Sequence, residues 1–167
     1  MIAETDNLVL REFQSGDAEN IYLLNLDQEV IKYTGDEPFN SIQEAERFLA
    51  SYDQYIKYGI GRWSVIRKSD EAFLGWCGLR YKEQSEEVDL GFRFHKKYWN
   101  QGYATEAAKA CIYYGMEKKS IQLIVGRVMK VNTASIAVLK KCGMKYLKDI
   151  SEIFLPIQMW TEILAKT

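Results

Sequence analysis

The stretch from Phe92 to Ala108 places the strongest constraint on how this chain can fold. It begins with an apolar segment and passes through Asn100-Gln101-Gly102-Tyr103 into a run of small residues. Gly102 has no side chain, so neighbouring backbone amides can approach an anion closely, and a helix N-terminus adds unpaired N–H groups and a favourable dipole. We therefore expect a strand, then a turn that binds a phosphate group at the start of a helix.

Length and composition favour one globular domain over residues 1–167, because 47% of the residues are hydrophobic. The chain has 22 basic and 23 acidic residues. This charge balance gives no electrostatic reason to expect nucleic acid as a partner, and it suits a cationic acceptor better. The N-terminus lacks a signal-peptide pattern, and no apolar run approaches the roughly 20 residues of a membrane helix. We expect a cytoplasmic protein with no membrane partner.

The cysteines predict neither a metal site nor a disulfide framework. Cys77, Cys111 and Cys142 lie far apart and without Cys-x-x-Cys spacing. They are expected to be buried, reduced thiols, and no metal is expected.

Periodicity in the first part of the chain predicts a strand over 7–13, a helix over 15–27, an irregular loop over 28–40, and a helix from Ser41 to about Gly59. Ser15 or Asp17 is expected to cap the first helix, and Ser41 with Glu44 fits a capping box for the second. The loop over 28–40 is assigned to the acceptor side.

In the rest of the chain, antiparallel strands are expected over 62–67, 72–81 and 87–94, then a helix to about Lys118 and a strand over 121–130. A helix capped by Asn132 or Thr133 and ending at Gly143 should follow, and then two strands around Pro156. The strand over 121–130 is apolar on both alternating faces, as is typical of a central strand. A helix between two strands favours a parallel pair.

Several motifs occur together and in a defined order. They are Leu8-x-Leu10-Arg11, Gly75-Trp76-Cys77-Gly78-Leu79, Gly102-Tyr103-Ala104-Thr105-Glu106-Ala107, and Asn132-x-x-Ser135 followed by Leu139 and Gly143-Met144. This set resembles the GCN5-related N-acetyltransferase (GNAT) superfamily, and most closely its RimJ/RimL-like branch of ribosomal-protein-alanine N-acetyltransferases.

The resemblance implies an α/β fold: one GNAT-like domain with a mixed sheet of six to seven strands, splayed between strands four and five, and about four flanking helices. It implies acetyl-coenzyme A as cosubstrate. The residues it assigns to coenzyme binding are Phe92, Arg93 and Phe94 for the pantetheine, Asn100, Gln101, Gly102, Tyr103, Ala104 and Thr105 for the pyrophosphate, and Asn132 for the pantetheine arm.

Two positions depart from the superfamily pattern. Trp99 stands where the turn usually opens with Gln or Arg. Leu139 stands where many members carry a tyrosine that protonates the departing thiolate. Resemblance to the ribosomal branch instead implies Ser135 as that acid, although Ser135 could simply hydrogen-bond its own helix.

The acceptor amine must lose a proton, since a lysine-type amine has a pKa of about 10.4 and is mostly charged at neutral pH. Glu86, Glu87 and Asp89 form the nearest acidic cluster, and Asp89 is our candidate base, although it could merely stabilise a strand end. A backbone N–H near Phe92 could stabilise the oxyanion.

The predicted function is an acetyl-coenzyme A-dependent N-acetyltransferase, in which the amine attacks directly in a ternary complex. The acceptor is either a small amine or a protein N-terminal α-amino group, and the charge balance favours the small amine. The alternative is a coenzyme-A-binding sensor or scaffold without turnover. The sequence allows a monomer or a homodimer.

Overall fold

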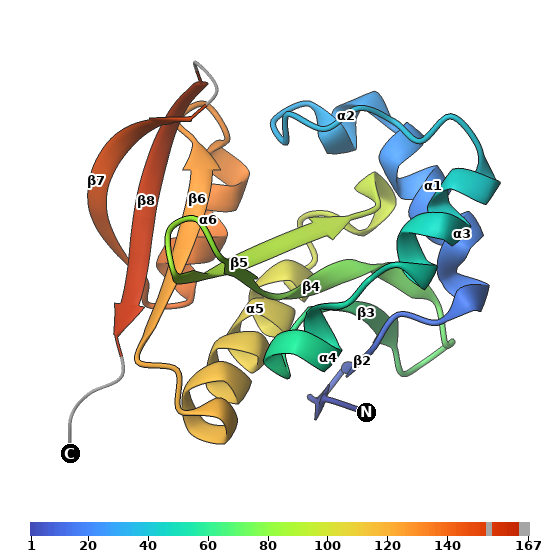
Figure 1. Ribbon diagram of the computed structural model, residues 1–167, viewed down its shortest axis with the longest axis horizontal. Helices are drawn as coiled ribbons and strands as arrows, with labels where there is room; N and C mark the ends of the chain where they lie inside the picture. The colour runs from blue at the N-terminus through green and yellow to red at the C-terminus, as the bar shows by residue number, and fades with distance from the viewer. Residues whose placement is uncertain (153–154, 164–167) are drawn as a thin grey trace.

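The computed structural model describes residues 1–152 and 155–163, and over these ranges the chain folds around an eight-stranded mixed sheet (Figure 1). The strand order is β1-β2-β3-β4-β5-β6-β8-β7. The strands are β1 (Ala3–Glu4), β2 (Leu8–Arg11), β3 (Arg62–Arg67), β4 (Phe73–Lys82), β5 (Glu87–Phe94), β6 (Leu123–Met129), β7 (Lys145–Glu152) and β8 (Leu155–Ile163). Neighbouring strands are antiparallel except β5 and β6.

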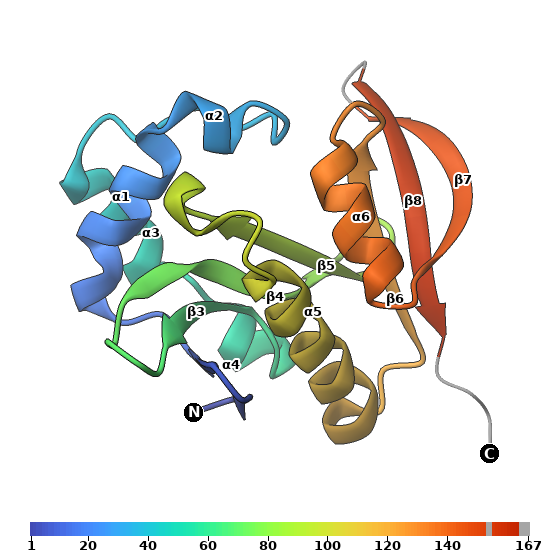
Figure 2. The ribbon, with the colours of Figure 1, turned by 180° about the vertical axis from the view of Figure 1, so that it is seen from behind.

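The helices are α1 (Ala18–Leu26), α2 (Gln28–Ile31), α3 (Ile42–Ala50), α4 (Gln54–Tyr58), α5 (Tyr103–Tyr113) and α6 (Thr133–Lys141). Figure 2 shows α5 and α6 in front of the sheet, whereas α3 and α4 lie on the side that faces the viewer in Figure 1. Helices therefore lie on both faces of the sheet. Within the described ranges, no helix has the length and apolar character needed to cross a membrane.

The sheet opens between β5 and β6. Residues 87–94 of β5 all pair with β4, but only Val88–Leu90 pair with Ile124–Gly126 of β6. Beyond this point β6 continues alongside β8, and β5 diverges from it (Figure 1). The parallel pair and the splay predicted between the fourth and fifth strands are confirmed. The extra strand is β1, which pairs with β2 and is too short to give a periodic signal.

The apolar face of α5 packs on the sheet through small residues. Ala107, Ala108 and Cys111 are fully buried, so the helix lies close to the strands. The Sγ atoms of Cys77 and Cys111 are 3.5 Å apart, as separate thiols, and burial raises the pKa of Cys111. Cys142 is only partly buried, unlike the other two.

The helix predicted from Ser41 to Gly59 is two helices, α3 and α4, with a break at 51–53. Ser41 caps α3 as expected by accepting from the Glu44 N–H at 3.2 Å. After the break the phase changes, so Ile56 is 91% exposed rather than part of the apolar stripe. The loop over 28–40 also contains α2, whose first turn is capped by Asp27.

Asp17 does not cap α1 with its side chain, contrary to the prediction. Its buried carboxylate accepts hydrogen bonds from Arg11 Nη1 at 2.7 Å, Arg11 Nη2 at 2.8 Å, Ser64 Oγ at 2.8 Å and the Gln14 N–H at 2.9 Å. Burial alone would raise the pKa of Asp17, but these hydrogen bonds outweigh it and hold the pKa below its ordinary value. Asp17 thus joins β2 and β3 to the start of α1.

Asp17→Asn is expected to lower the free energy of unfolding by about 2–4 kcal/mol at pH 7, because it leaves Arg11 without its charged partner. A carboxylate with a lowered pKa stabilises the fold above its unfolded pKa of about 3.9, and that contribution is lost as pH falls through the lower folded value. Urea titrations at pH 7 and pH 2 should therefore show the difference shrinking in acid. Asp70→Asn, which removes an exposed partner of Arg67, is the control with a smaller loss. Equal losses would contradict the assignment.

Candidate functional site

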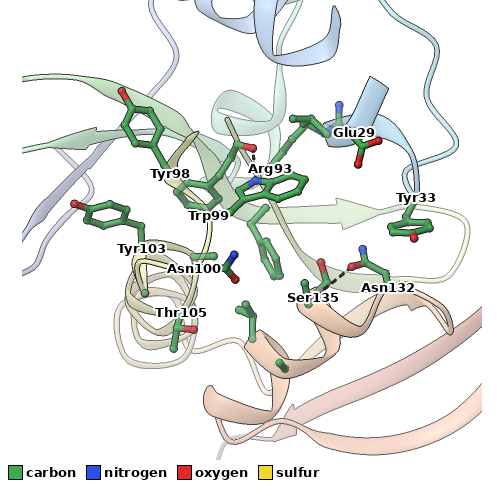
Figure 3. Close-up of a pocket in the computed structure, with 18 of the residues that line it drawn as sticks. Glu29, Tyr33, Arg93, Tyr98, Trp99, Asn100, Tyr103, Thr105, Asn132 and Ser135 are labelled. Carbon is green, nitrogen blue, oxygen red and sulfur yellow. Dashed lines mark hydrogen bonds between the residues drawn. The ribbon is translucent and has the colours of Figure 1, made fainter. Parts of the chain in front are cut away.

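A cavity of about 480 Å³ lies where β5 and β6 diverge (Figure 3). The cavity is lined by α2 and the residues after it, by the end of β5, by the turn before α5, and by α6. Elements far apart in the sequence thus enclose one site. Of the predicted residues, those that line it are Phe92, Arg93, Phe94, Asn100, Gly102, Tyr103, Ala104, Thr105, Asn132 and Ser135.

The turn before α5 has the geometry of an anion site. Asn100 and Gly102 both adopt left-handed backbone conformations, with φ of 59° and 85°. Gly102 is the N-cap of α5, and an added Cβ there would meet nothing within 4 Å. Because a glycine cap offers no side-chain acceptor, the first N–H groups of α5 remain for a ligand beside open space. The turn therefore fits a pyrophosphate.

Trp99 fixes this turn to the end of β5. Its indole Nε1 donates a hydrogen bond to the Phe94 carbonyl oxygen at 2.8 Å (Figure 3). The residue that replaces the usual Gln or Arg thus anchors the turn through the backbone of the strand. An anion at this turn would be bound by the backbone amides that follow Trp99.

On the opposite wall, Asn132 and Ser135 lie at the start of α6 (Figure 3). Asn132 Oδ1 accepts a hydrogen bond from the Ser135 N–H at 3.2 Å, which confirms Asn132 as a helix cap. The cap uses Oδ1 only, so the Nδ2 donor is not consumed by it. Asn132 can therefore cap α6 and still contact a ligand in the cavity.

Two predicted residues do not line the cavity. Gln101 is exposed, and its Nε2 donates to the Lys97 carbonyl oxygen at 2.9 Å. A coenzyme contact of Gln101 would therefore be made by its backbone amide alone. The second residue, Asp89, points to the face of the sheet on which α3 and α4 lie, because it alternates with Leu90, which is buried against the α5 side.

Asp89 is held by two arginines. Its side chain is 9% exposed, Arg127 Nη1 lies 3.1 Å from Oδ1, and Arg62 Nη2 lies 3.6 Å from Oδ2. Arg127 also pairs with Glu87. The carboxylate lies beside the splay, but as a base it would have to take a proton while facing guanidinium groups. Its catalytic role stays a prediction.

Arg93 has a structural side chain. Its Nη1 donates to Asn25 Oδ1 and its Nη2 to Asp36 Oδ2, both at 2.6 Å, and its guanidinium lies 5.3 Å from the Trp76 ring centroid. These contacts tie α1 and the segment after α2 to β5. Arg93 therefore positions the acceptor-side wall, while its backbone can serve the pantetheine.

Leu139 cannot take the place of the family's tyrosine. It is 2% exposed, and a Cβ added at Gly126 would lie 3.2 Å from its Cδ atoms. The residue fills the core between α6 and β6 and does not line the cavity.

The cavity wall also includes Tyr33 and Lys141, together with Glu29, Thr34 and Tyr98, which the sequence did not single out. Figure 3 shows Tyr33, from the segment after α2, on the same side of the view as Asn132. For Tyr33, the signal in the sequence is an aromatic residue within the segment 28–40, which was assigned to the acceptor side. Within the described residues, no three His, Cys, Asp or Glu side chains form a group that could hold a metal ion.

Comparison with known proteins supports this geometry. The family described as acetyltransferase (GNAT) domain matches residues 7–145. YoaA of Bacillus subtilis (strain 168), an uncharacterized N-acetyltransferase, is 31% identical over 147 residues, which cover 85% of this chain and 81% of YoaA.

Two solved structures share the fold. Spermidine N-acetyltransferase from Vibrio cholerae, in complex with CoA and spermine, has a TM-score of 0.81 at 17% identity, covering 96% of this chain and 97% of its own. Ribosomal-protein-S5-alanine acetyltransferase from Vibrio fischeri has a TM-score of 0.82 at 14% identity, covering 97% and 96%. The chain belongs to the GNAT acetyltransferase family.

Proposed function

We propose that the cavity binds acetyl-coenzyme A and that the chain transfers the acetyl group to a primary amine by direct attack in a ternary complex. One observation carries this proposal: the splay of β5 from β6 and the left-handed turn at the start of α5 open onto the same cavity. A strand edge and a helix N-terminus are the two features that an amide-containing arm ending in a pyrophosphate requires.

The coenzyme would lie along the wall formed by β5 and the turn. The pyrophosphate would accept hydrogen bonds from amides of residues 100–105, and the pantetheine would pair with the backbone of Phe92–Phe94 on the edge that β6 leaves. Asn132 would contact the pantetheine arm from α6. This placement brings the thioester to the splay.

In the reaction, the neutral amine nitrogen attacks the thioester carbonyl carbon and forms the C–N bond. The C–S bond then breaks, and coenzyme A leaves as a thiolate that takes a proton. The amine releases its proton to a base. A backbone N–H in the splayed strand near Phe92 would stabilise the oxyanion between these steps.

Ser135 is our candidate for the acid that protonates the thiolate. Ser135→Ala is expected to slow the chemical step about ten- to a hundred-fold, because general acid catalysis contributes on that order or more. Single-turnover measurements of thiol release with enzyme in excess report the step directly. Thr133→Ala, at an exposed position of the same helix, is the matched control. An unchanged rate for Ser135→Ala removes Ser135 from the mechanism.

Asp89 is our candidate base. Asp89→Asn is expected to lower kcat/KM about a hundred-fold and to move the ascent of its pH profile towards the acceptor's own pKa, because the amine must then lose its proton in solution. Glu87→Gln removes another partner of Arg127 and separates the loss of an ion pair from the loss of a base. If Asp89→Asn keeps both the rate and the ascent, Asp89 is eliminated.

A thiol-release assay over amines and peptides tests the function itself. We expect release of coenzyme A with at least one class of acceptor, and a rise in melting temperature with acetyl-coenzyme A, because a ligand of the native state must stabilise it. Tight coenzyme binding without release for any acceptor would instead favour the sensor. Failure to raise the melting temperature would overturn both.

A further inference from the structure

Arginines gather on the face of the sheet opposite α5. The strand register places Arg80 of β4 beside Asp89 of β5, and Arg62 of β3 beside Gly78 of β4. Arg127 of β6 lies two residues after the partner of Asp89 and so shares its face. The three guanidinium groups of this arginine cluster, Arg62, Arg80 and Arg127, therefore lie on one side of the sheet.

The arginine cluster lies next to the splay. Leu90 and Gly126 are the last paired residues of β5 and β6, so Gly91 and Arg127 are the first residues beyond the point of divergence. A Cβ added at Gly91 would lie 2.8 Å from Arg62 Nη2. The absence of a side chain at Gly91 thus lets the Arg62 guanidinium lie across β5, where the thioester would arrive.

The Arg62 guanidinium is held in place from several sides. It stacks over the Trp76 ring, 4.3 Å from the centroid. The Arg62 backbone is fixed by α4 and the segment before it, since its N–H donates to Tyr52 Oη at 2.8 Å and its carbonyl oxygen accepts from Tyr55 Oη. With its side chain 18% exposed, Arg62 is a positioned cation that a small ligand can still reach.

Two members of the arginine cluster, Arg62 and Arg80, lack a close carboxylate among the described residues. Arg127 pairs with Glu87 and Asp89. The oxygen of Asp89 nearest to Arg62 is 3.6 Å away, beyond hydrogen-bond distance. Arg80 forms no hydrogen bond or ion pair with the described part of the chain. Among the described residues, Arg62 and Arg80 therefore have no carboxylate within hydrogen-bond distance.

The guanidinium nitrogens also lack acceptors. The Nε atoms of Arg62 and Arg80 are buried, and neither has a hydrogen-bond partner among the described residues. A buried donor without an acceptor is unfavourable, and a buried charge without a partner more so. Burial and the nearby Arg80 lower the pKa of Arg62, while Asp89 alone does not offset them. An anionic ligand would supply acceptors for both arginines.

Resting on the proposed function, we propose that the acceptor is a small amine that carries a carboxylate, as an amino acid does, and that Arg62 and Arg80 bind this carboxylate while the amine faces the splay. Guanidinium groups match the planar carboxylate geometry. A polyamine would instead meet like charge, so this inference reverses the preference for a cationic acceptor drawn from the overall charge.

Matched acceptors test the proposal with the unaltered protein. The kcat/KM for thiol release at saturating acetyl-coenzyme A is compared for L-amino acids, their carboxamides, the corresponding decarboxylated amines and the aminophosphonates. We expect the carboxylate to be preferred about ten- to a hundred-fold, the range of a charge-assisted hydrogen bond. Preference for an aminophosphonate overturns the assignment to carboxylates. Equal or faster turnover of carboxamides or polyamines overturns the proposal and leaves the proposed function intact.

Arg80→Gln then tests the residue. The ratio of kcat/KM for an amino acid to that for its carboxamide is expected to fall towards one, whereas Arg47→Gln, at an exposed position of α3, should leave the ratio unchanged. An unchanged ratio in Arg80→Gln overturns the assignment of Arg80. If Arg80→Gln fails to fold, the acceptor comparison in the unaltered protein still decides the proposal. No thiol release from any acceptor overturns the proposed function and this inference with it.

Discussion

Gly102→Asp is expected to weaken acetyl-coenzyme A binding at least about a hundred-fold, or roughly 2.7 kcal/mol. The new carboxylate would stand at the N-cap of α5, where the proposed site holds a pyrophosphate, and the two negative charges would repel. A φ of 85° adds backbone strain for any residue with a side chain. Isothermal titration calorimetry gives the Kd directly.

Gly16→Asp is the matched control, because an added Cβ at Gly16 also meets nothing within 4 Å, while this glycine lies outside the cavity. It adds the same charge and should leave the Kd within about twofold of the unaltered protein. Gly102→Ala isolates the strain from the charge. Near-normal affinity in Gly102→Asp would show that the turn does not bind the pyrophosphate.

Gly78→Ala is expected to lower the free energy of unfolding by about 3 kcal/mol or more, at or beyond the usual range for overpacking. A Cβ at Gly78 would lie 2.2 Å from the Gly61 carbonyl oxygen and 2.6 Å from the Arg62 Cα. Both obstacles are backbone atoms, so β3 would have to move away from β4. Urea denaturation followed by circular dichroism measures the loss.

Gly91→Ala provides the comparison on the same rung of the sheet, since Gly91 pairs with Gly78. The atoms nearest to its Cβ would be the end of the Arg62 side chain, from 2.8 Å, and a side-chain end shifts at lower cost than a strand backbone. Gly91→Ala should therefore destabilise less than Gly78→Ala. The reverse order would mean that the close approach of β3 to β4 is not what requires a glycine at position 78.

The parts predicted correctly from the sequence are those set by local residues. The strand and turn before α5 could be predicted because apolar periodicity and Gly102 act within a few residues of each other. The Asn132 cap is likewise a contact between neighbours in sequence. The helix-capping rule failed for Asp17, because its carboxylate accepts hydrogen bonds from Arg11 of β2 and Ser64 of β3 instead of capping α1.

The arginine cluster could not have been predicted in this way. Arg62, Arg80 and Arg127 lie on different strands, and only the register brings them to one face. The sequence shows Asp89 as an acidic residue close to the expected coenzyme-binding strand. Its partners Arg62 and Arg127 follow only from the register of the strands. The break between α3 and α4 was missed for a related reason, because Tyr52 and Tyr55 are directed by their contacts with β3.

The pairing of β5 with β6 is short, limited to Val88–Leu90 and Ile124–Gly126. Beside it, the proposed acceptor site and the proposed coenzyme site meet from opposite faces of the sheet. The charged groups proposed to choose the acceptor, Arg62 and Arg80, lie on β3 and β4, whereas the groups proposed to hold the coenzyme lie at the end of β5, in the turn before α5 and at the start of α6. Substitutions in the first set need not disturb the second. A scaffold of this kind can exchange one amine for another while it keeps the same acyl donor.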